Sequence, residues 1–325
     1  MENKSSVKNY QSENTIKLLF AKAFNEAAND VVISKLSGGM KNAVYLIKKK
    51  NFKTVLKIAA KDETKLITVD RNILWWEVEM LKMMEQLSFP APKLLYYDDS
   101  CLLCESSYFF MSYIEGEPLL NVRKDLSSLE IANIDYELGL LSSKISSISG
   151  NRYYIPSMID KYFENNYQFI VYLFEQLIND ARSISLDLKE DIYESIMNIL
   201  KDNHNSLNNT TGIFLTHTDI WDGNILINNG KVAGIVDFSD LYYCDELLNF
   251  YFHNIDGKTS EHFLKGYNKE LNNTDKMRIE IYRMYVIIKM IVDCKLKEYG
   301  RFEWMYENLN NRMNLIKNES LKKRF

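Results

Sequence analysis

Three polar side chains between residues 214 and 240 are of types that can hold a metal ion and move a proton. Asp219 is followed five residues later by Asn224, and Asp237 comes thirteen residues after that. A carboxylate and an amide that lie close together can bind a hard cation such as Mg²⁺, which prefers oxygen ligands. A second acid nearby can accept a proton from a hydroxyl group or orient it. The set therefore points to phosphoryl transfer, in which positioning and charge neutralisation do most of the catalysis.

A β-hairpin is expected to bring these side chains together. Asn229-Gly230 lies between two apolar runs, and both residues tolerate the positive φ that a tight hairpin turn requires. A turn centred there places Asn224 opposite Ile235 and Asp237 opposite Asp222. Facing Cβ atoms in such a hairpin lie about 4.5–5.5 Å apart. The spacing therefore predicts that the acid and the amide meet at the open end of the hairpin.

The rest of the chain supplies the elements that position this hairpin. Apolar side chains within residues 71–87 recur at helical spacing, and Pro90 and Pro92 end that helix. Glu115–Pro118 is the best candidate for a break between domains. The expected elements are a helix over 8–27, strands over 31–36, 43–48 and 53–59, the helix over 71–87, strands near 93–97 and 108–113, three helices within 126–207, strands within 213–238, and helices within 245–317.

The residue pattern of segment 217–238 resembles that of a known family. His217-x-Asp219-x-x-x-x-Asn224, followed by Asp237-Phe238, resembles the catalytic loop and metal-binding motif of the protein-kinase-like superfamily. The run Asp-Ile-Trp-Asp-Gly-Asn-Ile-Leu and the short distance between the two motifs are similar to the aminoglycoside phosphotransferase/choline kinase family. This resemblance implies that Asp219 is the catalytic base and that Asn224 and Asp237 bind Mg²⁺.

The resemblance also implies a nucleotide-binding lobe in the first part of the chain. Lys57 stands inside an apolar strand, where a lysine taken alone more often points to solvent; in the family this lysine binds the α- and β-phosphates of ATP. A helical glutamate pairs with it there, and Glu77 is the natural choice, with Glu79 as the alternative.

Two backbone segments complete the implied ATP site. Gly38 and Gly39 lie between two predicted strands, where glycine lets the backbone approach a phosphate, although a plain turn explains them equally well. Ser112, Tyr113 and Ile114 end the last strand of the lobe and, by the resemblance, meet the adenine through their backbone groups.

The fold class implied is α+β: a bilobal protein-kinase-like fold with a small antiparallel-sheet N-lobe and a mostly helical C-lobe. The lobes are expected at residues 1–114, with an N-terminal helix, and at 115–325, with the catalytic hairpin and the acceptor site. The implied function is an ATP- and Mg²⁺-dependent transfer of the γ-phosphate to a hydroxyl of a small molecule, most readily an aminoglycoside or similar antibiotic. The alternatives are a kinase of a choline- or sugar-like metabolite, a protein kinase, and a non-catalytic kinase-shaped binding protein.

Composition sets further limits on function. Lys and Arg number 40 against 44 Asp and Glu, a net charge of −4, so there is no basic excess to drive nucleic-acid binding. The longest apolar stretches, such as Tyr285–Ile288, fall far short of the roughly 18 residues that span a bilayer. The N-terminus has no apolar segment of the kind found in secretory signals. We therefore expect a soluble, cytoplasmic protein that binds neither nucleic acid nor membrane; the sequence does not indicate an oligomeric state.

The cysteines fit the same compartment. Cys101 and Cys104 form a C-x-x-C in an apolar, strand-like stretch, and the remaining two cysteines stand apart. The four histidines are scattered, so a zinc site is not indicated. We expect buried free thiols, as in a reducing compartment.

The acceptor is the least determined part of the function. A polycationic acceptor needs carboxylates near the base, and Asp240, Asp245 and Glu246 follow the metal-binding motif. Asp222 and Asp240 lie close to the predicted metal ligands, and we expect both to be solvated. The last helices add acidic and aromatic side chains mixed with lysine and arginine, which a solvated amphipathic helix explains as well: Glu298, Tyr299, Glu303, Trp304, Tyr306 and Glu307.

Overall fold

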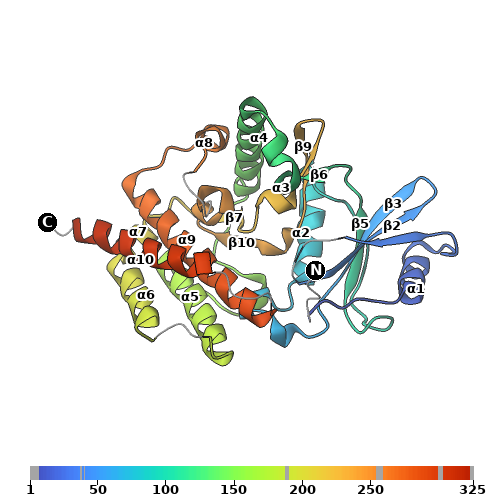
Figure 1. Ribbon diagram of the computed structural model, residues 1–325, viewed down its shortest axis with the longest axis horizontal. Coiled ribbons are helices and arrows are strands. Elements are labelled where there is room, and N and C mark those ends of the chain that lie inside the picture. Colours follow the sequence, from blue (N-terminus) through green and yellow to red (C-terminus); the bar gives the residue numbers. More distant parts are fainter. Residues whose placement is uncertain are drawn as a thin grey trace. The chain divides into compact units, whose positions relative to one another are not determined.

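A computed structural model describes residues 7–36, 39, 41–186, 190–253, 259–298 and 303–322. The chain forms two compact units, and the sequence passes from one to the other several times (Figure 1). The first unit contains residues 1–66, 72–125 and 222–239, and the second contains residues 67–71, 126–221 and 240–325. Each unit is described here on its own.

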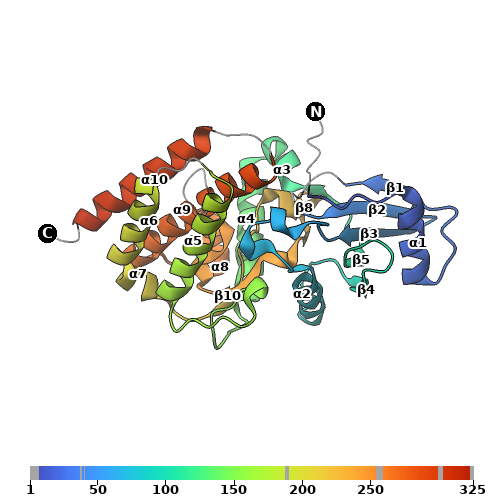
Figure 2. The same cartoon turned by 90° about the horizontal axis from the view of Figure 1, so that it is seen from below.

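An antiparallel sheet forms the frame of the first unit. Its five strands lie in the order β1-β2-β3-β5-β4, which Figure 2 shows from below. All five were predicted from the sequence, and their bounds are β1 (Val32–Lys35), β2 (Ala43–Lys49), β3 (Phe52–Ile58), β4 (Leu94–Asp98) and β5 (Tyr108–Ser112).

The two faces of this sheet have different roles. One face packs apolar side chains such as Tyr45, Leu56 and Phe110 against α1 (Glu13–Phe24). Side chains alternate along a strand, so Lys57 points to the opposite face from Leu56. That face meets α2 (Leu74–Gln86), because Lys57 bonds to a side chain of α2.

Helix α1 is shorter than the 8–27 expected from the sequence. It begins after Ser12, whose hydroxyl accepts a hydrogen bond from the Thr15 N–H, and it ends at Asn25 in the left-handed conformation. Both are common helix-ending devices. Tyr10 and Ala27, which the expected range included, lie outside the helix and are exposed.

The predicted hairpin is present in the first unit, with one difference in register. Strands β8 (Ile225–Asn228) and β9 (Lys231–Ile235) meet at a turn in which Asn229 and Gly230 both have positive φ, and β6 (Glu117–Pro118) pairs with β8. A bulge shifts the pairing beyond Ile227, so Ile235 faces Ile225. The prediction that Asn224 faces Ile235 is therefore wrong by one residue, because a turn fixes the register only as far as the first bulge.

The second unit is mostly helical. Strands β7 (Phe214–His217) and β10 (Leu241–Cys244) form its two-stranded antiparallel ladder. In Figure 1, α4 runs beside α8, and α10 lies along α9. The helices of this unit are α4 (Ser128–Ser146), α5 (Asn166–Ser183), α6 (Glu190–Asp202), α7 (His204–Asn208), α8 (Glu261–Tyr267), α9 (Asn273–Leu296) and α10 (Glu303–Lys322); α3 (Leu119–Val122) belongs to the first unit.

Close packing and capping explain the ends and contacts of these helices. Ser127 with Glu130, and Asn272 with Asp275, form reciprocal capping boxes at the starts of α4 and α9. A Cβ added to Gly139 of α4 would lie 2.2 Å from the Phe263 carbonyl oxygen of α8. The two helix backbones therefore approach more closely than any larger side chain allows.

Within the described parts of the chain, no helix has the length and apolar character needed to cross a membrane.

The C-x-x-C stretch is a turn between β4 and β5 and not the strand that the sequence had suggested. Cys101 is exposed with a positive φ, so the expectation of a buried thiol is wrong for this residue, whereas Cys104 is buried. The apolar Leu102, which made the stretch look like a strand, is 80% exposed.

Candidate active site

Lys57 is the centre of a buried ionic cluster in the first unit. Its Nζ lies 2.7 Å from Oε2 of Glu77 and 2.8 Å from Oδ1 of Asp237. Lys57 is 5% exposed and Glu77 is 1% exposed. Of the two glutamates that the sequence left open, Glu77 makes the pair with Lys57, whereas Glu79 is exposed and bonds to Lys82.

Burial and charge act against each other in this cluster. Burial opposes the charge on Lys57, but Asp237 and Glu77 outweigh it, so the pKa of Lys57 is raised. Burial raises the pKa of Glu77 to about 7, and Asp237 adds to the effect, while Lys57 works against it. One ammonium thus contacts two carboxylates, and burial is the main reason that the pKa of Glu77 is raised.

The backbone at Asp237 has an uncommon conformation. Its φ is +66°, in the left-handed region that few residues other than glycine adopt. Ser239 donates from its hydroxyl to Oδ1 of Asp237 at 3.1 Å, and the buried Phe238 packs edge-on against Phe89. These contacts hold a locally strained residue in place, as is common where a side chain must point at a ligand.

Asn224 is buried and ends a short 3₁₀ turn over Asp222–Asn224. Its carbonyl accepts a hydrogen bond from the Val236 N–H at 2.9 Å, which joins the chain next to Asp237 to the chain at Asn224. Arg123 donates to both carboxylate oxygens of Asp222, from Nε to Oδ2 at 2.5 Å and from Nη2 to Oδ1 at 3.2 Å. Asp222 is therefore paired, and the expectation that it is solvated is wrong.

The chemistry of this donor set fits Mg²⁺. Asp237 offers carboxylate oxygens and Asn224 an amide oxygen, and magnesium takes one or two such ligands together with phosphate oxygens and water. No group of three or more His, Cys, Asp or Glu side chains suited to a metal occurs among the described residues. A cation held here would thus depend on the substrate phosphates, which would be brought close by Lys57.

The predicted adenine and phosphate segments lie at opposite ends of the strands of this sheet. Ser112 faces Thr54 near the start of β3, whereas Gly39 precedes β2, whose first residue faces the end of β3. Ser112 is the last residue of β5; its N–H donates to the Lys93 carbonyl and its hydroxyl accepts from the Lys93 N–H, both at 2.8 Å. Gly39 has a φ of +58° and open space where a Cβ would stand, while the predicted residue Gly38 lies outside the described residues.

The predicted base lies in the second unit. Asp219 is half-buried and follows β7, and its N–H donates to Nδ1 of the buried His217 at 3.3 Å. Thr218 donates from its N–H and from its hydroxyl to the carbonyl oxygen of Asp240, at 2.9 and 3.0 Å. The loop that carries Asp219 is thus held by two bonds from Thr218 to one carbonyl oxygen and by the bond from the Asp219 N–H to the His217 ring.

The acids expected to bind a cationic acceptor are paired with cations of the same unit. Lys289 lies 3.0 Å from Asp240, Arg278 lies 2.8 Å from Asp245, and Lys269 lies 2.5 Å from Glu246. Asp240 and Asp245 are each 1% exposed. The expectation that Asp240 is solvated is wrong, since a buried carboxylate is retained only with a partner.

The partners of these acids gave no signal in the sequence. Arg123 is 99 residues from Asp222, and Lys289 is 49 residues from Asp240. Each stands on a helix or turn where a solvated side chain is equally reasonable. Ser239, which donates to Asp237, carries no local pattern that indicates this contact either.

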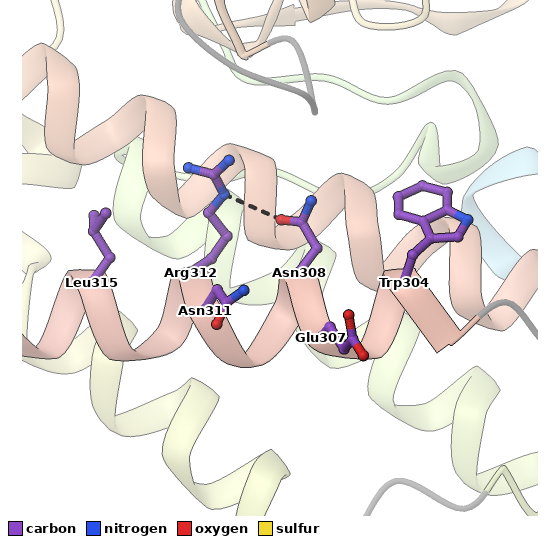
Figure 3. A pocket seen from close by; sticks show the side chains of 6 residues that line it. All are labelled: Trp304, Glu307, Asn308, Asn311, Arg312 and Leu315. Atoms are coloured by element: carbon purple, nitrogen blue, oxygen red, sulfur yellow. Dashed lines mark hydrogen bonds between the residues drawn. The ribbon is translucent and has the colours of Figure 1, made fainter.

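Helix α10 carries a separate groove of about 550 Å³ (Figure 3). The expected acceptor residues Trp304 and Glu307 line it and both are exposed; Tyr299 lies outside the described residues. Arg312 bonds to Asn308 across the groove at 3.2 Å and to Glu280 of α9 at 2.9 Å. The complete lining is Trp304, Glu307, Asn308, Asn311, Arg312 and Leu315.

Comparison with known proteins identifies the family. A sequence model of the phosphotransferase enzyme family matches residues 32–278, which covers both the Lys57 cluster and the Asp219 loop. The chain belongs to this family. It is therefore an enzyme of the phosphotransferase class, and the resemblance seen in the sequence is confirmed. No curated protein sequence matches the chain.

Solved structures with the same fold include kinases of several small molecules. The complex of APH(2'')-IIa with streptomycin and ATP is 20% identical, with 94% of this chain and 97% of that chain covered and a TM-score of 0.63. A putative fructosamine-3-kinase from Haemophilus somnus 129PT is 14% identical, with 93% and 97% covered and a TM-score of 0.67. The complex of APH(4)-Ia with AMP-PNP and hygromycin B is also 14% identical, with 93% and 97% covered and a TM-score of 0.62. At these identities the likeness is one of fold, and it confirms the predicted fold class.

Proposed function

We propose that this chain transfers the γ-phosphoryl group of Mg-ATP to a hydroxyl group of a small molecule. The observation that carries the proposal is the buried cluster in which Lys57 contacts both Glu77 and Asp237. Lys57 would bind the α- and β-phosphates, with Glu77 orienting it, and Asn224 and Asp237 would hold Mg²⁺. Bound Mg²⁺ neutralises charge on the phosphates.

Asp219, which belongs to the second unit, would supply the base for the proposed chemistry. The acceptor hydroxyl gives its proton to the Asp219 carboxylate as its oxygen forms a bond to the γ-phosphorus. The bond between that phosphorus and the oxygen bridging it to the β-phosphate breaks, and ADP leaves with that oxygen. Asp219 is half-buried, so part of the residue is open to solvent.

The first candidate acceptor is an aminoglycoside. Two of the structures that share this fold hold the aminoglycosides streptomycin and hygromycin B. An aminoglycoside kinase would confer antibiotic resistance, and ATP-dependent action on an imported drug would take place in the cytoplasm.

A specific observation favours a second candidate, a sugar-like or choline-like metabolite that is not polycationic. Asp240, Asp245 and Glu246 were the acids closest in sequence to the metal motif, and each is neutralised by a cation of its own unit. A polycationic acceptor would find little unpaired negative charge on these three residues. A fructosamine kinase shares the fold, and a choline-like acceptor belongs in the same test.

The test is ADP release from Mg-ATP against a panel of aminoglycosides, choline, fructosamines and neutral sugars. Acceptor-dependent release supports the proposal, and the responding compound names the acceptor class. A thermal shift with Mg-ATP should accompany it, because a nucleotide that binds only the folded state stabilises that state. Neither release nor shift would favour a non-catalytic binding protein, and transfer to a generic protein substrate would favour a protein kinase.

Variants assign the roles within this reaction. Asp219→Asn should nearly abolish transfer while nucleotide binding persists. Asp237→Ala should lose the Mg²⁺-dependent part of nucleotide binding. Asp191→Asn, an exposed acid on α6 of the second unit, is the matched control and should behave as the wild type. Full turnover in Asp219→Asn would refute the assignment of the base.

A further inference from the structure

Lys289 joins two buried carboxylates inside the second unit. It lies on α9, and its Nζ is 3.0 Å from Oδ1 of Asp240 and 3.4 Å from Oδ1 of Asp70. The side chains of both acids are 1% exposed, and that of Lys289 is 21% exposed. Tyr242, also buried, donates its hydroxyl to Asp240 at 3.4 Å. The two carboxylates are 170 residues apart in the sequence, so only the fold brings them to one ammonium.

The same Asp240 supports the catalytic loop through its backbone. Its carbonyl oxygen accepts from both the N–H and the hydroxyl of Thr218, the residue immediately before Asp219. The next residue, Leu241, faces His217 across the β7–β10 ladder. The position of Asp240 therefore sets the backbone of the loop that carries the proposed base.

The charge on Lys289 is what makes the burial of Asp240 tolerable. Removing one partner of a buried ion pair leaves an uncompensated charge, which is strongly unfavourable. Burial opposes the charge on Lys289, yet Asp240 and Asp70 outweigh it, and the pKa of Lys289 is raised. The ammonium is therefore retained, and without it Asp70 and Asp240 would face each other as like charges.

The turn that carries Asp70 is anchored through a neighbouring residue. Asp70 belongs to a short 3₁₀ turn, Thr68–Asp70, and Thr68 donates to the Asp180 carboxylate from both its N–H and its hydroxyl, at 2.7 and 2.6 Å. These bonds hold the turn to α5 without Lys289. The Asp240 side chain contacts the Tyr242 hydroxyl at 3.4 Å and the Lys289 ammonium at 3.0 Å, so loss of Lys289 removes a cation from it.

We propose that Lys289 is a positioning residue for phosphoryl transfer, which holds Asp240 against Thr218 and thereby fixes the backbone that orients Asp219. The inference rests on the proposed function, because it takes Asp219 as the base. It predicts that loss of the Lys289–Asp240 contact slows transfer without weakening nucleotide binding, since Lys57, Glu77 and Asp237 belong to the first unit.

The test compares variants by turnover of Mg-ATP with the responding acceptor, and by γ-labelled ATP hydrolysis with water as acceptor. Lys289→Met keeps the side-chain length and removes the charge. We expect its kcat to fall about 10- to 100-fold, the effect of a small misplacement of a catalytic group. Its KM for Mg-ATP and its stoichiometry of bound nucleotide should stay unchanged. Lys295→Met, at an exposed position of the same helix, is the control.

A charge-matched double variant separates positioning from charge balance. Lys289→Met together with Asp70→Asn restores the cluster charge of the wild type but not the contact to Asp240, and it remains available if the single variant does not fold. A kcat that stays low in this double variant supports the proposal, and a return to the wild-type kcat overturns it.

A double-mutant cycle with the base gives the second readout. Residues that act as a unit are not additive, so Lys289→Met should cause no further loss in the Asp219→Asn background. An additive loss there, or a kcat of Lys289→Met within twofold of the wild type, would overturn the positioning role alone. Wild-type turnover in Asp219→Asn itself would instead refute the assignment of Asp219 as the base in the proposed function.

Discussion

The substitution Glu77→Gln tests the electrostatics of the Lys57 cluster. Glu77 is 1% exposed, and burial together with Asp237 raises its pKa from 4.5 to about 7, although Lys57 opposes the effect. A carboxyl whose pKa is raised by folding stabilises the folded state fully below its unfolded pKa. That contribution is lost as the pH rises through the folded pKa. Glutamine keeps the shape of the side chain and does not titrate.

The size of the effect follows from the two pKa values. The difference between 4.5 and about 7 corresponds to about 3 kcal/mol of unfolding free energy. Between pH 4.5 and pH 8 the wild type should therefore lose about 3 kcal/mol relative to Glu77→Gln. The loss should be steepest between pH 5 and about 7, where the unfolded chain is already ionised and the folded one is not.

The assay is urea unfolding across this pH range, followed by fluorescence of Trp75 and Trp76. These residues precede Glu77 in α2. The substitutions Trp221→Phe and Trp304→Phe, made in every variant, remove the signal of the other two tryptophans. Glu79→Gln, an exposed position on the same helix, is the control and should run parallel to the wild type. Parallel curves for the wild type and Glu77→Gln would refute the reasoning, because Lys57 would then keep Glu77 ionised throughout.

Three further outcomes are expected. Gly139→Ala should destabilise the second unit by about 3 kcal/mol in urea unfolding, because the added Cβ would stand 2.2 Å from the Phe263 carbonyl. Arg278→Met should cost about 3–5 kcal/mol near neutral pH and less in acid, because it leaves the buried Asp245 carboxylate without its cation; equal loss at both pH values would contradict this. Of the four thiols, Cys101 alone should react quickly with a thiol reagent under native conditions, and peptide mapping would identify it.

Features with a short-range signal were predicted well. Helical and strand spacing is set by a few neighbouring residues, which explains why all five strands of the sheet and the helix α2 follow in the expected order. The turn at Asn229-Gly230 was equally readable because its requirement for positive φ is local. The bulge beyond Ile227 could not be predicted from the sequence, because it depends on the residues against which the strand packs.

Features that depend on long-range pairing were not readable from local patterns. A lysine within an apolar strand points to solvent in most cases, and the burial of Lys57 is explained only by Glu77 and by Asp237, 180 residues away. The family resemblance implied the pair with Glu77, and neither the resemblance nor the spacing of the residues indicated the contact with Asp237. The segment Cys101–Cys104 was wrongly expected to be strand-like. Its apolar residues lie in a turn, and a local pattern cannot show whether a partner strand exists.

The acidic residues after Asp237 show why counting charges is a poor guide to an acceptor. A carboxylate inside a fold must bring its own cation, so Asp240 and Asp245 were bound to be neutralised once they were buried. Only carboxylates that are exposed at the surface and lack a cation of their own can attract a cationic acceptor from solution. Among the acids considered for the acceptor, Glu298, Glu303 and Glu307 are exposed, and the last two stand one turn apart on α10. Of the acids considered, a polycationic acceptor would therefore find its countercharge on these three, whereas a neutral sugar would not depend on them.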